Sequence, residues 1–323
     1  MELLTANIAS PVVLAFALGI IARAIRSDLA IPPQIQTYLS IFLLLAIGLK
    51  GGVALRGQDP AQLAMMLGVT LAAGAATAMS AYALARWMLG DIRREAAAMA
   101  AHYGSVSAVT FIAASQFVER TGNPAEGVLV ALLVALEVPA LLIGLALGQR
   151  GSRGTGGAHA GGSHHALREV FTGKTAVLLL GGLAIGAITG PGGIKSVDAM
   201  YFALFQGVLM LFMLDMGMIA AQRLSELRRG WLRLLGYCLA VPLLHGVAGV
   251  AIGHAMGLSL GGVVVFATML SSASYIAAPA AVRAGLPEAD VGRCITAALG
   301  ITFPFNLAVG IPLYAALAGR LAA

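Results

Sequence analysis

Apolar residues occur in long runs separated by short polar connections along almost the whole chain. Each run is close to the length, about 20 residues, that an α-helix needs to cross the hydrocarbon core of a bilayer. Ten such runs predict an all-α integral membrane protein with ten transmembrane helices. The runs lie near residues 8–25, 34–55, 61–89, 96–118, 125–148, 173–190, 198–222, 231–256, 260–283 and 291–318.

Composition agrees with this interpretation and argues against a soluble enzyme. Of 323 residues, 59% are hydrophobic and 11% are charged, and the mean hydropathy is +0.90. These values lie outside the range of soluble globular domains. The runs leave little room for a soluble catalytic domain, and no His-Glu-x-x-His zinc pattern occurs. We therefore expect a transporter or a channel rather than a membrane-embedded hydrolase, and no cofactor.

Lysine and arginine are distributed unevenly between the two sets of connections. Fifteen of the 20 follow odd-numbered runs, and the other five are Lys50, Arg56, Arg120, Lys195 and Arg320. Cytoplasmic loops carry the Lys and Arg excess, so both termini are expected outside a bacterial plasma (inner) membrane. A basic face toward anionic lipid accounts for the net charge of +6, which therefore predicts no nucleic-acid partner.

The one long connection divides the chain into two halves. It runs from Gln149 to Arg168, is rich in glycine and contains three histidines. Such a composition is typical of a flexible linker rather than a metal site. We expect a first five-span repeat at residues 1–148, a flexible cytoplasmic linker at 149–170 and a second five-span repeat at 171–323. Because each half has an odd number of spans, the second repeat is inverted relative to the first, as in many secondary transporters.

Short stretches recur in the same order in the two halves. The pairs are Phe42-Leu-Leu-Leu-Ala-Ile-Gly48 with Leu211-Phe-Met-Leu-Asp-Met-Gly217, Arg120-Thr-Gly-Asn-Pro124 with Arg283-Ala-Gly-Leu-Pro287, and Glu137-Val-Pro139 with Thr302-Phe-Pro304. Their order favours the inverted repeat.

Two runs contain serine clusters at matching places, Tyr103-Gly-Ser-Val-Ser-Ala-Val-Thr110 and Leu270-Ser-Ser-Ala-Ser-Tyr-Ile-Ala-Ala-Pro279. Irregular backbone survives at bilayer depth only where it lines a cavity enclosed by protein. Spans 4 and 9 are therefore predicted to be broken at the midplane, as in many transporter binding sites. The candidate substrate-binding residues are Gly104, Ser105, Ser107, Thr110, Ser271, Ser272, Ser274 and Tyr275.

The two breaks favour a small anion as substrate. The second half-helices, expected to begin near Ala108 and near Tyr275, start at the midplane and run in opposite directions. Helix N-termini offer unpaired N–H groups and about half a positive charge each. Serine and threonine hydroxyls add donors and acceptors, although they also bond to carbonyls of their own helices.

Ionisable residues inside the runs are candidates for coupling, because a charge in lipid is costly. They are Lys50, His102, Glu137, Asp215 and His245. Glu137 and Asp215, with Ser107 and Ser274, are the candidate ligands of a sodium ion, and the two acids are also candidate proton carriers. The structural alternatives are a satisfied interhelical pair for each acid and an outward-snorkelling side chain for Lys50.

With these residues the chain resembles the sodium-dependent bicarbonate transporter family, known best from cyanobacteria. The resemblance covers nearly the whole chain and depends on an ordered set of short motifs rather than on one signature. The motifs are Gly48-Leu-Lys-Gly-Gly-Val-Ala-Leu-Arg56, the Tyr103–Thr110 stretch, Glu137-Val-Pro-Ala-Leu141, Met216-Gly-Met218, Arg223-Leu-Ser-Glu-Leu227, Gly261-Gly-Val-Val-Val265 and Arg283-Ala-Gly-Leu-Pro287.

The resemblance implies a homotrimer of ten-span protomers that imports bicarbonate with sodium, with the anion held where the two broken helices cross. It also implies a cytoplasmic regulatory partner of the PII type. The chain departs from the cyanobacterial pattern at Tyr275, where that pattern has Asp, at Ala46, where it has Lys, and at Asp215, where it has an apolar residue. A proton-coupled carrier of another small anion or carboxylate on the same fold therefore stays open as the alternative, with Glu137, Asp215 and His102 as the relay.

Overall fold

The computed structural model describes residues 7–149, 168, 172–225 and 231–322. Within these residues every regular element is a helix. In chain order the helices are α2 (Pro11–Ala24), α3 (Pro33–Leu55), α4 (Pro60–Leu84), η1 (Ala85–Leu89), α5 (Arg93–Tyr103), α6 (Ala108–Arg120), α7 (Val128–Gln149), α9 (Lys174–Ile194), η2 (Lys195–Val197), η3 (Ala199–Ala203), α10 (Phe205–Ser225), α11 (Trp231–Ala255), α12 (Leu260–Ser271), α13 (Ala277–Gly285), α14 (Val291–Ile295), η4 (Thr296–Thr302), α15 (Phe303–Phe305), η5 (Asn306–Gly310) and α16 (Ile311–Ala322).

Each hydropathy run overlaps at least one of these helices. In the described part of the chain, eight helical segments are long and apolar enough to cross a membrane. The two other predicted spans have shorter helices: α2 has 14 residues, and α12 has 12. The protein is thus all-helical with eight candidate membrane-spanning helices, and the ten-span count stays a prediction.

Helical structure stops inside both serine clusters. α5 ends at Tyr103 and α6 begins at Ala108, while α12 ends at Ser271 and α13 begins at Ala277. The extended backbone of Ser107 and Ser272 separates the helices on either side. We call residues 104–107 the first interruption and residues 272–276 the second. α13 begins two residues later than the expected start near Tyr275.

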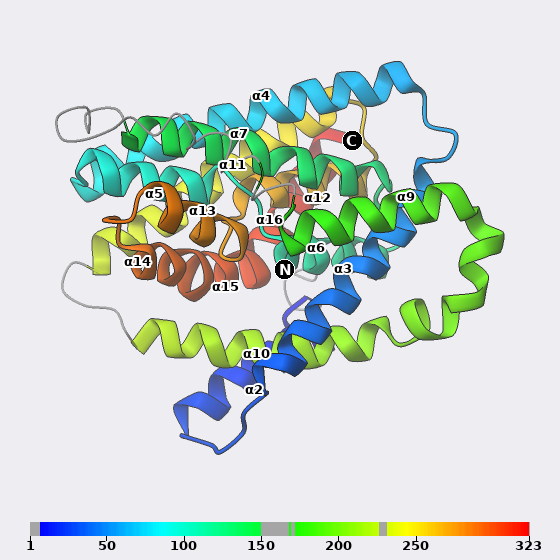
Figure 1. Ribbon diagram of the computed structural model, residues 1–323, viewed down its shortest axis with the longest axis horizontal. Coiled ribbons are helices and arrows are strands. Elements are labelled where there is room, and N and C mark those ends of the chain that lie inside the picture. Colours follow the sequence, from blue (N-terminus) through cyan, green and yellow to red (C-terminus); the bar gives the residue numbers. More distant parts are fainter. Residues whose placement is uncertain (1–6, 150–167, 169–171, 226–230, 323) are drawn as a thin grey trace.

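The helices form two packed sets. In the first, which we call the four-helix group, α3 lies along α9 and α10 lies along α2 (Figure 1). Glycines allow the close approach of α3 and α9, since a β-carbon on Gly48 would lie 2.9 Å from the Gly182 Cα. In the second set, the central group, α4 and α5 pack on α7, and α12 packs on α11, α16 and α6. Both interruptions belong to the central group.

Two connections each contact the start of a helix in the other half of the chain. After α6, Glu126 accepts a hydrogen bond from the Ser259 N–H at the start of α12, with 2.5 Å between Oε1 and N. After α13, the Asp290 N–H donates to Glu95 near the start of α5 at 3.2 Å, and Glu288 pairs with Arg94. The contacts tie the first half-helix of each half to the loop that follows the second half-helix of the other.

Candidate functional site

The two interruptions touch each other. The Ser107 N–H donates a hydrogen bond to the Ser272 hydroxyl at 2.9 Å, and the Ser274 N–H donates to the His102 carbonyl at 2.8 Å. All four residues are buried. Backbone groups freed by the loss of helix are therefore partly satisfied by the other interruption, as a low-dielectric setting requires.

The helices that follow the interruptions begin at the same small cavity. It is lined by Ser107 and Ala108 at the start of α6 and by Ile276 and Ala277 at the start of α13. Serine hydroxyls cap both first turns: Ser107 Oγ accepts from the Thr110 N–H at 3.2 Å, and Ser274 Oγ accepts from the Ala278 N–H at 3.1 Å. Two positive helix ends on one cavity favour an anion.

The remaining wall of this cavity includes one acid and one residue of the four-helix group. Glu137 of α7 and Thr175 of α9 line it with Ser274 and Tyr275, and both Glu137 and Thr175 are buried. The cavity measures about 10 Å³, which is room for about one water molecule. The wall of this cavity therefore comes from both helix groups.

We call the place where residues 104–107 and 272–276 meet the crossing. Three buried polar atoms beside it lack a hydrogen-bond partner among the described residues. They are Ser105 Oγ, His102 Nε2 and the Tyr275 hydroxyl. The Tyr275 hydroxyl faces Ser107 without reaching hydrogen-bond geometry. An unsatisfied buried polar atom costs about 1–3 kcal/mol, so these atoms are available to a ligand.

A family comparison fits this geometry. The model of the Na+-dependent bicarbonate transporter superfamily matches residues 11–319, nearly the whole chain. The chain belongs to this superfamily. Comparison with curated proteins gave no match. Membership confirms the resemblance and indicates a multi-pass membrane transporter, with bicarbonate and sodium as its solutes, rather than an enzyme.

Other predicted site residues lie around the crossing in structural roles. Gly104 packs against α4, where a β-carbon would lie 2.6 Å from the Ala78 Cα. Ser271 Oγ donates to the Thr268 carbonyl at 3.0 Å and lies 3.2 Å from the Asn306 side-chain oxygen. Thr110 is buried and supplies the N–H that Ser107 accepts.

Glu137 and Asp215, the two candidate sodium ligands with acidic side chains, do not line the same cavity. Glu137 lines the crossing with Ser107 and Ser274, whereas Asp215 is absent from that lining. Asp215 lies in α10 of the four-helix group, buried, with Oδ2 unpartnered among the described residues. The described residues contain no group of three or more His, Cys, Asp or Glu side chains placed for a metal ion.

Two residues near the crossing were not predicted from the sequence as site residues. Asn306 at the start of η5 donates from Nδ2 to the Ser271 carbonyl at 2.9 Å and so holds the end of α12. Thr175 lines the cavity from α9. Asn306 follows the matched Thr302-Phe-Pro304 stretch by two positions and is polar inside an apolar run, which is a usable signal. Thr175 lies at the start of a run, where a threonine is unremarkable.

One serine matches a catalytic pattern without catalytic surroundings. Gly257-Leu-Ser-Leu-Gly261 fits the Gly-x-Ser-x-Gly pattern of serine hydrolases. Ser259, however, is the N-cap of α12, and its Oγ accepts the Gly262 N–H at 3.1 Å. In this chain the serine of the pattern caps the start of α12.

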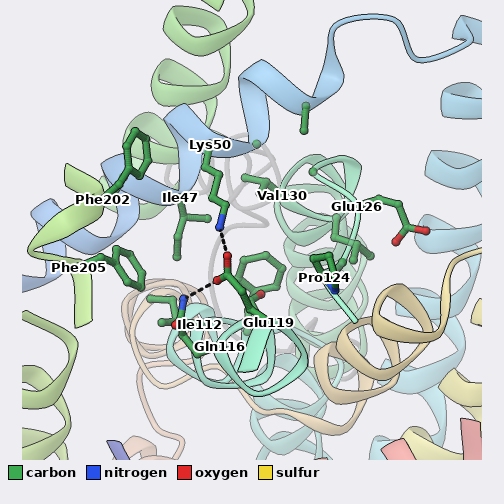
Figure 2. A pocket seen from close by; sticks show the side chains of 18 of the residues that line it. Ile47, Lys50, Ile112, Gln116, Glu119, Pro124, Glu126, Val130, Phe202 and Phe205 are labelled. Atoms are coloured by element: carbon green, nitrogen blue, oxygen red, sulfur yellow. Dashed lines mark hydrogen bonds and ion pairs between the residues drawn. The ribbon is translucent and has the colours of Figure 1, made fainter. Parts of the chain in front are cut away.

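A second, larger cavity lies between the two helix groups. It measures about 400 Å³ and is lined by α3, α6, α7, η3, α10 and the connection after α6 (Figure 2). Its charged pair is Lys50 of α3 and Glu119 of α6, 2.5 Å apart. Lys50 therefore has an acidic partner in addition to the solvent contact expected of a snorkelling side chain. We call this cavity the outer pocket, because the connection after α6 lines it and connections that follow even-numbered runs are expected on the outside.

Proposed function

We propose that the protein is a secondary active symporter that imports bicarbonate together with sodium. The observation that carries the proposal is the shared cavity at the starts of α6 and α13. Bicarbonate is a small planar anion, so two positive helix ends and capping serine hydroxyls suit its charge and its hydrogen-bonding capacity. Ser105 and Tyr275 supply further polar atoms that have no hydrogen-bond partner among the described residues.

Alternating access in this proposal comes from movement of the four-helix group against the central group. The cavity wall combines Thr175 of the first group with Ser107, Ser274 and Tyr275 of the second. A shift between the groups opens the crossing to one side of the membrane and then to the other, as in other transporters built from repeats.

The proposed organisation is two inverted five-span repeats, residues 1–148 and 171–323, with spans 4 and 9 broken at the midplane. The exchanged contacts support it: Glu126 reaches the start of α12, and Asp290 reaches Glu95 near the start of α5. Such reciprocity is expected of two equivalent halves. Most of the proposed linker, residues 149–170, lies outside the described residues, as do the three histidines within it.

Sodium is proposed to bind beside the anion. Glu137, Ser107 and Ser274 line one cavity and offer the oxygen atoms that a hard cation prefers. Asp215, which lies apart from that lining, is proposed to contribute only when the helix groups have moved. A cation next to the anion also offsets the cost of burying either charge alone.

Cellular context is proposed from the family resemblance and the charge bias. We place the protein in a bacterial inner membrane with both termini outside, as a homotrimer, with a PII-like regulatory protein as its cytoplasmic partner. Light scattering of the detergent-solubilised protein tests the trimer. Co-purification from the native membrane tests the regulatory partner.

One observation favours a second candidate function. Glu137 is an acid inside the cavity, where a neutral, protonated carboxyl group is cheaper to bury than a carboxylate. A proton-coupled carrier of a small carboxylate would use Glu137 in that form, with Asp215 and His102 as the rest of the relay. Uptake in sodium-free buffer across a pH series separates the two, because only the proton-coupled carrier retains activity.

The experiment that tests the main proposal is uptake of radiolabelled bicarbonate into proteoliposomes, with and without an inward sodium gradient. Accumulation that requires the gradient supports symport. Equal uptake in both conditions contradicts sodium coupling. No uptake by folded protein contradicts bicarbonate as the substrate, and a screen of small carboxylates at several pH values then follows.

A further inference from the structure

The outer pocket is too large to be explained by bicarbonate. Its volume is about 400 Å³, whereas the cavity at the crossing measures about 10 Å³. Pockets of about 300–1,000 Å³ are typical of sites for organic small molecules. An anion of only four non-hydrogen atoms would leave most of the outer pocket filled with water.

Its walls are apolar and partly aromatic. Phe111 of α6 and Phe202 and Phe205 near the start of α10 line it, together with Ile47 and Ile112. In Figure 2 the side chains of Phe202 and Phe205 lie on one side and those of Pro124 and Val130 on the other. These walls suit an apolar group of several carbon atoms.

Four of its polar side chains form one connected row. Lys50 Nζ donates to Glu119 Oε1 at 2.5 Å, and Gln116 Nε2 donates to Glu119 Oε2 at 3.3 Å. Gln206 of α10 in turn donates to the Gln116 side-chain oxygen. The row joins α3 and α10 of the four-helix group to α6 of the central group.

A second lining acid, Glu126, faces the start of α12. Its Oε2 is buried without a hydrogen-bond partner among the described residues and lies where a β-carbon on Gly262 of α12 would stand. Its Oε1 accepts the Ser259 N–H at the start of α12, and its carboxylate points away from the Lys50–Glu119 pair in Figure 2. A carboxylate at a helix N-terminus is stabilised there. The charges that an occupant of the outer pocket meets are therefore one ammonium and one carboxylate.

The balance of these two charges selects the occupant. At present water screens the pair, because 62% of the Lys50 side chain and 44% of the Glu119 side chain is exposed. The two charges pair with each other, and an apolar occupant that displaces the water strengthens every electrostatic interaction at the pair. An anion bound to Lys50 would then lie against the Glu119 carboxylate, and a cation bound to Glu119 would lie against the Lys50 ammonium group, so each would meet a like charge. A zwitterion pairs with both and leaves neither charge unmatched.

We propose that the outer pocket is a binding site for a zwitterionic amino acid with an apolar side chain. Its carboxylate pairs with Lys50, its ammonium group pairs with Glu119, and its side chain packs against Phe111, Phe202 and Phe205. The site is separate from the crossing and goes beyond the proposed bicarbonate transport. Because it touches both helix groups, an occupant also ties them together.

The test is calorimetric titration of the full-length protein in detergent with three probes that share one ring. L-phenylalanine carries both charges, 3-phenylpropionate only the carboxylate, and 2-phenylethylamine only the ammonium group. We expect L-phenylalanine to bind at least about tenfold more tightly than either single-charge probe, since it alone forms both charge-assisted contacts. Equal affinity for the three probes, tighter binding of a single-charge probe, or no binding of L-phenylalanine overturns the proposal.

Two variants and one control sharpen the test. Lys50→Met and Glu119→Gln each remove one charge, and each is expected to weaken L-phenylalanine binding by at least about tenfold. Ser274→Ala, at the crossing, is expected to leave it unchanged. Unaltered binding in folded Lys50→Met or Glu119→Gln overturns the assignment, and if either variant fails to fold, the three-probe comparison on the unsubstituted protein decides. Because the measurement needs no bicarbonate or sodium, a failure of the proposed transport function does not affect its outcome.

Discussion

The first interruption is held largely by packing against α4, whereas the second is held by hydrogen bonds to Asn306. Gly104 fits against the Ala78 backbone, and its carbonyl accepts a 3.4 Å bond from Thr77. Ser271, at the edge of the second interruption, has two polar contacts with Asn306. Matching sequences thus lead to matching helix ends, and the surrounding helices support each end in a different way.

The difference follows from which neighbour each interruption meets. α4 is rich in alanine and glycine, so it offers a close surface and few polar atoms. Asn306 is the first residue of the π-helical stretch η5, which follows the π-helical stretch η4 and the short helix α15, and it is fully buried. π-Helical segments are frequent at functional sites. We therefore expect the first interruption to tolerate loss of a hydrogen bond better than added side-chain volume. For the second interruption we expect the opposite.

The largest effect is expected from Asn306→Ala. The change removes both contacts with Ser271 and leaves buried polar atoms unsatisfied at the end of α12. We expect a loss of about 3 kcal/mol in unfolding free energy, measured as a lower thermal midpoint in detergent. Ser271→Ala, which retains the contact to its backbone carbonyl, is the matched control and should lose less. Equal midpoints for Asn306→Ala and the unsubstituted protein would contradict the support assigned to Asn306.

Gly104→Ala tests the packing side of the comparison. The new methyl group would overlap the Ala78 backbone, which cannot move aside as a flexible side chain can. We expect a destabilisation of about 2 kcal/mol, seen in the same thermal measurement. Gly68→Ala in α4 is the control, because nothing lies within 4 Å of its added carbon, and it should be neutral or slightly stabilising. A Gly104→Ala protein as stable as this control would show that the first interruption is loosely packed.

The all-helical fold was accessible from the sequence, because hydropathy is a local signal, and the serine clusters marked where α5 and α12 end. That these two ends are breaks within membrane spans stays a prediction. The start of α13 was expected near Tyr275, two residues early, since the Ser274 hydroxyl caps the Ala278 N–H rather than one nearer in sequence. The sequence did not predict which serines of the two clusters would bond to each other, so the hydrogen bond between Ser107 and Ser272 was not foreseen. Asn306 and Thr175 reach the crossing from other helices, and no local pattern says which helix face will meet which cavity.

Ser107→Ala and Ser274→Ala compare the two helix starts directly. Each removes a hydroxyl that accepts a first-turn N–H, and loss of such a cap costs about 1 kcal/mol. Both variants should also bind substrate more weakly while remaining folded and inserted, because both hydroxyls line the cavity. The check is the apparent affinity for bicarbonate in proteoliposome uptake, alongside the thermal midpoint. Normal uptake by both variants would mean that the substrate site lies elsewhere.

The smallest effect is expected from Thr77→Val. The Thr77 hydroxyl also donates to the Gly74 carbonyl of its own helix at 3.0 Å, so its 3.4 Å contact with Gly104 is the weaker of two. Valine keeps the branched shape and the packing of α4 against the first interruption. We therefore expect a loss of only about 0.5 kcal/mol, a small shift in thermal midpoint, and unchanged uptake. If Thr77→Val were as damaging as Gly104→Ala, hydrogen bonding rather than space would hold the first interruption, and the contrast between the two interruptions would disappear.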